Sequence, residues 1–281
     1  MPPDTVLPQE ASATKMEGAP TRFRLHARRD AAAAERRRLE RDLATALQRG
    51  AFLLHYQPRV VLATGAAIAA EALLRWPHRK QGMIPPAMFI PLAERSGQII
   101  AIGEWVLRAA CQQAAGWPPS WSLSVNVSPR QLEGGALLGQ VSTALETSGL
   151  APERLELELT ESLLVDVDTD TLLLLSAVRD LGVGLALDDF GTGYASLAVL
   201  KRLPLTVMKL DRSLVRDLPA DREDAAIVRA VIATGHALGL TVVAEGIESE
   251  AQRAFLAGSG CDEGQGYLFS QPVPPERLGF V

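Results

Sequence analysis

The chain repeats one pattern throughout: a short apolar segment that predicts a β-strand, then an amphipathic segment that predicts a helix. About eight such strands alternate with helices over the 281 residues. This rhythm and this length are typical of an α/β protein with a (β/α)8 barrel, the TIM-like fold. A doubly wound open sheet is the alternative that the same pattern allows.

The first two expected strands depart from the repeat. Residues 52–61 and 66–75 both have the apolar pattern of strands, and the connection around Thr64-Gly65 is short. Strands joined in this way form an antiparallel hairpin. We therefore expect a barrel with an antiparallel opening strand.

The remaining elements are expected in this order. Strands are predicted at residues 121–127, 155–161, 183–188, 205–210 and 240–244, and a last strand or turn at 264–270. Helices are predicted at residues 31–48, 89–94, 99–115, 135–148, 170–180, 224–238 and 249–256. The start of the chain is rich in Pro, Ala, Thr and charge and has no periodicity, so residues 1–30 are expected to be a disordered or linker segment. Residues 31–281 are expected to form one domain.

Composition narrows the classes of function. The chain is 47% apolar and 22% charged, as in ordinary globular proteins, and its net charge of -5 gives no general attraction to a nucleic acid polymer. No apolar segment reaches the roughly 18 residues of a membrane span. Cys111 and Cys261 are too few for a disulfide framework, so we expect reduced core cysteines in a cytoplasmic protein, with a disulfide as the alternative.

Polar residues recur at or near the C-terminal ends of the expected strands. They are Glu71, Asn126, Glu158, Asp188, Asp189, Lys209, Glu245 and Gln265. In a barrel these strand ends meet at one mouth, where active sites lie. Each residue alone has an ordinary explanation, such as a surface ion pair for Glu71 or Glu158 and a helix cap for Asn126. Their repetition predicts a single cluster that contains five carboxylates and one ammonium group.

So many carboxylates cannot share a pocket in ionised form without cations. Carboxylate and amide oxygens favour Mg²⁺ or Mn²⁺, and the histidines and cysteines are not spaced as zinc ligands. Two such ions suit in-line displacement at phosphorus, and a lysine beside them would orient water or offset phosphate charge. The residues therefore predict metal-dependent phosphoester hydrolysis, and sugar hydrolysis by paired acids is the alternative.

Nine short segments in order carry a resemblance to a known family. They are Tyr56-Gln-Pro58, Glu71-Ala-Leu-Leu-Arg-Trp76, Phe89-Ile-Pro-Leu-Ala-Glu94, Val125-Asn-Val-Ser128, Glu158-Leu-Thr-Glu-Ser162, Asp188-Asp-Phe-Gly-Thr-Gly-Tyr194, Lys209-Leu-Asp211, Ala244-Glu-Gly-Ile-Glu248 and Gln265-Gly-Tyr267. Together they resemble the EAL-domain phosphodiesterases, which linearise cyclic di-GMP to pGpG. The resemblance covers residues 39–272, and its departures are small: Ala195 where Ser is commoner and Leu210 where Ile is usual.

The resemblance implies a role for each matching residue. The metal ligands would be Glu71, Asn126, Glu158 and Asp188 for one ion, with Asp188 bridging to a second ion held by Asp189 and Glu245. The attacking water would be held by Lys209, Glu245 and Gln265. The resemblance leaves open which of these groups is the general base. The substrate would contact Gln57, Leu73 and Arg75, and the loop from Asp189 to Leu197 would be anchored by Glu161, with Asp211 and Glu248 near it.

The resemblance also implies partners. Family members couple dimerisation to metal binding through the Asp189 loop, so a homodimer is expected. Residues 21–29 resemble the tail that follows a cyclase-type domain, which suggests an upstream sensory or cyclase-type domain. The alternative functions are a catalytically silent cyclic di-GMP receptor and, third, a protein-interaction scaffold.

Overall fold

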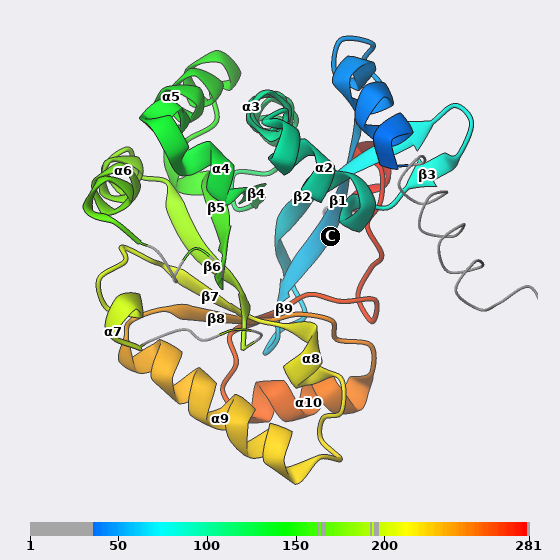
Figure 1. The fold of residues 1–281 in the computed structure, drawn as a ribbon. Coiled ribbons are helices and arrows are strands. Elements are labelled where there is room, and N and C mark those ends of the chain that lie inside the picture. Colours follow the sequence, from blue (N-terminus) through cyan, green and yellow to red (C-terminus); the bar gives the residue numbers. More distant parts are fainter. Residues whose placement is uncertain (1–35, 162, 164–166, 192, 194–196, 280–281) are drawn as a thin grey trace, which may run out of the picture.

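The computed structural model describes residues 36–161, 163, 167–191, 193 and 197–279 (Figure 1). The expected linker at residues 1–30 lies outside these residues. The strands are β1 (Leu53–Val61), β2 (Ala67–His78), β3 (Gly82–Ile84), β4 (Ser122–Val127), β5 (Leu155–Thr160), β6 (Gly184–Phe190), β7 (Val207–Leu210), β8 (Thr241–Ala244) and β9 (Glu263–Gly264). The labelled helices are α2 (Pro86–Ser96), α3 (Ile99–Ala114), α4 (Pro129–Leu132), α5 (Ala136–Ser148), α6 (Thr169–Asp180), α7 (Leu197–Leu200), α8 (Arg212–Val215), α9 (Arg222–Ala237) and α10 (Glu250–Gly258).

The sheet closes on itself. Neighbouring strands run in the order β1-β9-β8-β7-β6-β5-β4-β2, and a further pairing joins β1 to β2. Strand β1 is antiparallel to both of its neighbours, and β2, β4, β5, β6, β7, β8 and β9 pair in parallel. The expected barrel with an antiparallel opening strand is therefore confirmed, and the open sheet is excluded because β1 bridges its two edges.

Alternation along the strands separates two environments. On β5, Leu155, Leu157 and Leu159 are buried in the cluster that also contains residues of the surrounding helices. The residues between them, Glu156 and Glu158, are buried as well but point to the opposite face of the strand. The leucines pack against the outer layer of helices. The opposite face of β5 therefore lines the interior of the barrel, where Glu156 and Glu158 lie.

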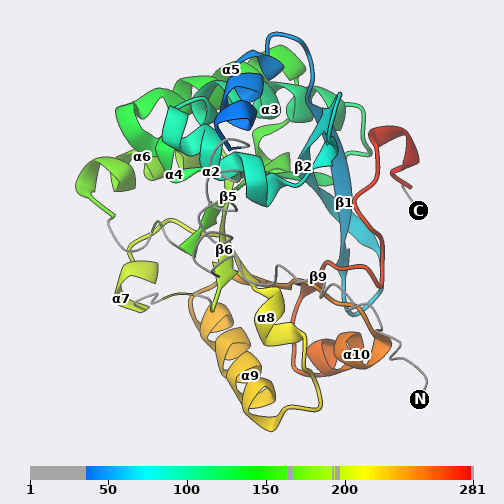
Figure 2. The same ribbon diagram turned by 45° about the vertical axis from the view of Figure 1, so that its right-hand side comes forward.

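The helices cover the outside of the barrel. In Figures 1 and 2, α3, α5 and α6 lie on one side and α9 and α10 on another. Helix α9 shows why such a segment folds locally: Asp221 accepts hydrogen bonds from the Glu223 and Asp224 amides, and Val228 and Ile232 are buried one turn apart. Burial of each such side chain contributes about 1.5–3 kcal/mol.

The last expected element is a turn, and one strand was not expected. Glu263–Gly264 form a two-residue strand, and residues 266–269 form a turn, which is one of the two forms predicted for 264–270. A Cβ at Gly266 would lie 2.1 Å from the Ile247 carbonyl oxygen, so glycine permits the close approach of the two backbones here. Strand β3 was not predicted, since three residues that include Gly82 carry no periodic signal.

The cysteines and the helices bear on two expectations from the sequence, reduced cysteines and the lack of a membrane span. Cys111 and Cys261 are free and buried, as expected for reduced core cysteines. Within the described part of the chain, no helix combines the length and the apolar character needed to cross a bilayer.

Candidate active site

Lys209 is the centre of a carboxylate cluster at the mouth of the barrel. Its side chain comes from β7, and the residue is 0% exposed. Its Nζ lies 2.8 Å from Glu158, 3.3 Å from Asp188 and 3.8 Å from Glu71. Glu245, directly after β8, is 2.5 Å away. Acids from four strands thus surround one buried ammonium group, as the sequence predicted, although Glu71 lies inside β2 rather than at its end, because β2 continues to His78. Glu158 is buried and is therefore not a surface acid.

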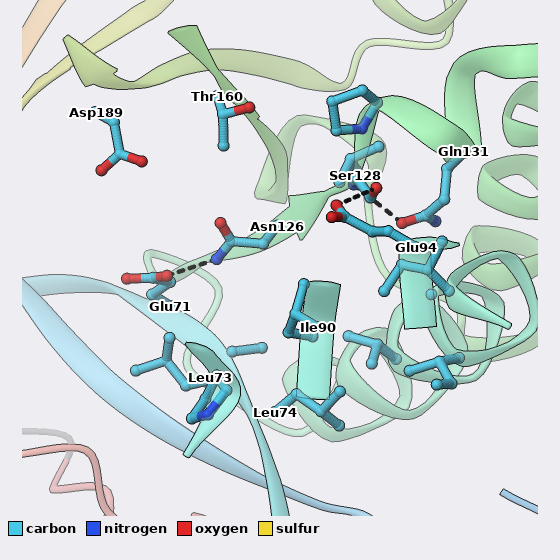
Figure 3. Close-up of a pocket in the computed structure, with 18 of the residues that line it drawn as sticks. Glu71, Leu73, Leu74, Ile90, Glu94, Asn126, Ser128, Gln131, Thr160 and Asp189 are labelled. Atoms are coloured by element: carbon cyan, nitrogen blue, oxygen red, sulfur yellow. Dashed lines mark hydrogen bonds between the residues drawn. The ribbon is translucent and has the colours of Figure 1, made fainter. Parts of the chain in front are cut away.

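Two amides hold Glu71 from both sides. Asn126 Nδ2 donates to Glu71 Oε1 at 2.6 Å, and Gln265 Nε2 donates to Glu71 Oε2 at 2.7 Å. Gln265 also donates to Gln57 Oε1 at 3.1 Å, and Gln57 donates to the Ser270 carbonyl oxygen at 3.0 Å. Figure 3 shows the Asn126 amide nitrogen on Glu71 and its oxygen turned away. That oxygen is therefore available as a ligand at the exposed mouth.

Asp189 has an unusual backbone. Its φ of 57° is the one positive φ of a non-glycine residue within the described residues, and its amide donates to Asp188 Oδ1 at 2.9 Å. A left-handed aspartate costs of order 1 kcal/mol and is typical of functional sites. One oxygen each of Asp188, Asp189 and Glu245 lies within 4.8 Å of the others. The strained turn thus aims adjacent acids at one point that could hold a metal ion.

The site is short of positive charge. Burial raises the pKa of Glu158 well above its ordinary value, and the nearby Glu71 carboxylate raises it further. Burial also raises the pKa of Glu245 to about 7, against the effect of Lys209. Burial and the adjacent Asp188 raise the pKa of Asp189 to about 6. One lysine shared among these acids leaves a demand for cations, and the oxygen donors fit Mg²⁺ or Mn²⁺.

Two cavities adjoin the cluster. One of about 620 Å³ extends from Glu71, Asn126 and Asp189 to Glu94 and is lined by apolar side chains between them (Figure 3). A second cavity, of about 260 Å³, is lined by Gln57, Glu245 and Gln265 among others. Among the residues that line them, Glu71 and Leu73 face both cavities. The mouth therefore offers an extended groove with the carboxylates in its middle.

The residues expected to contact substrate lie along this groove. Arg75 and Leu73 line the larger cavity, and Gln57 lines the smaller one. Arg75 is half-buried, and its Nη1 donates to the Leu74 carbonyl oxygen at 3.0 Å. Among the described residues, this is the one hydrogen bond of its guanidinium group, whose remaining N–H donors could bind an anion.

Glu161 contacts the start of the expected loop. This buried carboxylate accepts hydrogen bonds from the Gly191 and Gly193 amides, both at 3.0 Å. Asp211 instead caps α8 through the Ser213 amide at 2.8 Å, and Glu248 pairs with Arg212 Nη2 at 2.7 Å. Within the loop, residues 192 and 194–196, among them Ala195, lie outside the described residues.

Sequence reasoning missed a second polar layer inside the barrel. It lies beneath the mouth and consists of Arg59, Ser124, Glu156 and Glu263. Burial alone would raise the pKa of Glu156, but the Arg59 charge and two hydrogen bonds bring it below its ordinary value. The signal was available for three of them, because Arg59, Ser124 and Glu156 each lie two positions from a mouth residue on the same strand and thus on the same face.

The fold and the site together define an α/β barrel with a cluster of acidic residues, suited to binding metal ions, toward the carboxyl ends of its strands. The EAL domain family model matches residues 40–272, so the chain belongs to the EAL domain family, as its motifs indicated.

Named relatives align with most of this chain. The chain is 45% identical over 253 residues to the bifunctional diguanylate cyclase/cyclic di-GMP phosphodiesterase MucR of Pseudomonas aeruginosa, over 89% of this chain and 37% of MucR. It is 45% identical over 244 residues to the cyclic di-GMP phosphodiesterase NbdA of the same species, over 85% of this chain and 31% of NbdA. The solved PaMucR phosphodiesterase complex with c-di-GMP has a TM-score of 0.82 at 45% identity and covers 86% of this chain and 100% of that chain. The chain spans about a third of the length of these curated relatives.

Proposed function

We propose that this chain is a metal-dependent phosphodiesterase that hydrolyses cyclic di-GMP to linear pGpG. The observation that carries the proposal is the convergence on Lys209 of four acids that come from or directly follow four different strands: Glu71, Glu158, Asp188 and Glu245. A receptor would need only a groove, whereas a buried lysine within a ring of acids is costly to maintain without catalysis. Relatives named as cyclic di-GMP phosphodiesterases support the choice of substrate.

Two ions, Mg²⁺ or Mn²⁺, fit the oxygen donors of the mouth. Glu71, Asn126, Glu158 and Asp188 would hold one, and Asp188, Asp189 and Glu245 the other. The chemistry that such ions supply is activation of water and stabilisation of charge on the phosphodiester.

The protein's own groups would position the reactants. Lys209 Nζ lies among the acids and would hold the attacking water, with Glu245 beside it. Gln265 and Asn126 fix the orientation of Glu71 through their amides. Gln265 would therefore act on the attacking water indirectly, by holding Glu71 in position. Arg75 would bind a substrate phosphate at the edge of the groove, and Leu73 and Gln57 would contact the nucleotide. Such fixed donors act without reorganisation during the reaction.

Hydrolysis in ¹⁸O-labelled water tests the reaction. We expect one ¹⁸O atom in the terminal phosphate of pGpG, because water attacks phosphorus once and a single P–O bond breaks. Unlabelled pGpG would contradict the proposed attack by water. Cyclic di-GMP that binds but is recovered intact with either metal would favour the silent receptor instead.

We also propose the assembly and setting. The domain would span residues 31–281, form a homodimer through the helices beside the Asp189 loop, follow a sensory or cyclase-type domain and act in the cytoplasm. Light scattering with metal and substrate analogue present should give twice the mass of one chain. A single-chain mass under the conditions of turnover would rule out the dimer.

Glu161→Ala should weaken metal binding. The change removes two hydrogen bonds to a charged group, each worth about 1.5–3 kcal/mol, and frees the backbone that follows Asp189. We expect the apparent Mn²⁺ affinity to fall about 10–100-fold, the usual effect of losing a group that orients a ligand. Calorimetry measures the affinity, and Glu146→Ala on the exposed face of α5 is the control. Equal affinity of the two variants would show that Glu161 does not support the site.

A further inference from the structure

A buried ion-pair layer lies directly below the proposed metal site. Arg59 Nη1 contacts Glu156 Oε1 at 2.6 Å, and Arg59 Nε contacts Glu263 Oε2 at 2.7 Å. Ser124 Oγ donates to the same Glu156 oxygen at 2.8 Å. Arg59 thereby joins β1 to β5 and to β9, across the seam where the barrel closes.

Each partner of Arg59 is two residues before a mouth residue in the chain. Glu156 and Glu158 both lie on β5, whereas Glu263 lies on β9 and Gln265, which donates to Glu71, directly follows that strand. Residues two apart on a strand share a face and a rigid segment of backbone. The position of Arg59 would thus affect two proposed ligands of the same ion. It would affect Glu158 through Glu156 on the same strand, and Glu71 through Glu263 and Gln265.

The seam combines a short ladder with irregular pairing. Strand β9 has two residues, and its ladder with β1 consists of the pairs Val60–Gly264 and Val61–Glu263. The β1 register also shifts between Arg59 and Val60 where it pairs with β2. Gln265 follows this ladder and has backbone hydrogen bonds to Ala244 and Ile247, and the ion pair of Arg59 with Glu263 adds a side-chain restraint two positions before it.

We propose that Arg59 is a positioning residue of the metal site, which sets the geometry of Glu158 and Glu71 through Glu156 and Glu263. The proposal rests on the proposed function, because it assumes that these two acids ligate metal. Among the described residues, Arg59 has no hydrogen bond or ion pair to a proposed metal ligand and lines neither cavity, so it would act through its partners and through the effect of its charge on Glu158.

Mn²⁺ calorimetry on the full chain separates positioning from stability. Arg59→Met should bind Mn²⁺ about 10–100-fold more weakly than the wild type, at a temperature where both remain folded. Arg59→Lys should be intermediate, since a single ammonium group cannot reproduce the two-sided fork of the guanidinium group. Val141→Ala, a cavity variant in the buried face of α5, should lose stability and keep its Mn²⁺ affinity.

The outcomes are distinguishable. Folded Arg59→Met with wild-type Mn²⁺ affinity would overturn the positioning role and leave the proposed function intact. Wild-type protein that binds no Mn²⁺ would overturn the proposed function and this inference with it. If Arg59→Met does not fold, Glu263→Gln removes one ion pair alone, and several-fold weaker Mn²⁺ binding is expected; unchanged binding would refute the route through β9.

Discussion

Glu71→Ala should abolish hydrolysis of cyclic di-GMP while leaving the protein folded. The substitution removes both oxygens that Asn126 and Gln265 orient and that lie nearest the two cavities. We expect the turnover rate to fall by at least about 10³-fold, a loss of roughly 4 kcal/mol of transition-state stabilisation. Chromatography of cyclic di-GMP and pGpG over time measures the rate.

A matched acid at the other end of the barrel provides the control. Glu153 is exposed beside the start of β5, so Glu153→Ala removes the same charge far from the mouth and should retain wild-type turnover. Loss of activity in both variants would indicate a general effect of charge or folding. Full activity of Glu71→Ala would remove Glu71 from the metal site.

Lys209→Met should destabilise the metal-free protein and inactivate the loaded one. Methionine keeps much of the side-chain volume but leaves the acids around Lys209 without their shared cation. Removing one partner of a buried ionic network costs about 3–5 kcal/mol. We expect a large drop in melting temperature in EDTA that Mg²⁺ largely reverses, because bound ions replace the missing charge. Turnover should stay about 10²–10⁴-fold low, as for loss of a group that handles the reacting water.

The contrast between stability and activity makes this variant informative. Exposed Lys201 offers the control, since Lys201→Met should change neither property. Recovery of both stability and turnover on adding Mg²⁺ would show that Lys209 only balances charge. Unchanged melting in EDTA would show that the acids do not depend on it.

The site could be predicted from the sequence where polar residues recur at or near the ends of successive strands. Polar residues at successive strand ends predicted the barrel mouth, and Lys209 and Glu158 lie in it as expected. The hairpin between β1 and β2 followed from its short connection, and its antiparallel pairing places Gln57 opposite Glu71. These features depend on local pattern and on the convergence that any closed barrel imposes.

Contacts between distant segments could not be derived from local patterns. Arg59 looks like one arginine in a strand, yet its partners are 97 and 204 residues away in the chain, at Glu156 and Glu263. The left-handed backbone of Asp189 could not be predicted either, because it belongs to an irregularity in the pairing of β6 with β7 between Leu187 and Phe190. The close packing of Gly266 on Ile247 could not be predicted either, because the two segments meet only in the folded chain.

The most direct measurement is the fate of cyclic di-GMP incubated with the purified full chain in Mg²⁺, Mn²⁺ or EDTA, followed by chromatography and mass spectrometry. The carboxylate cluster around Lys209 predicts conversion to pGpG with either metal and none in EDTA. Intact cyclic di-GMP in all three incubations, with the protein folded and metal bound, would contradict the proposed phosphodiesterase activity.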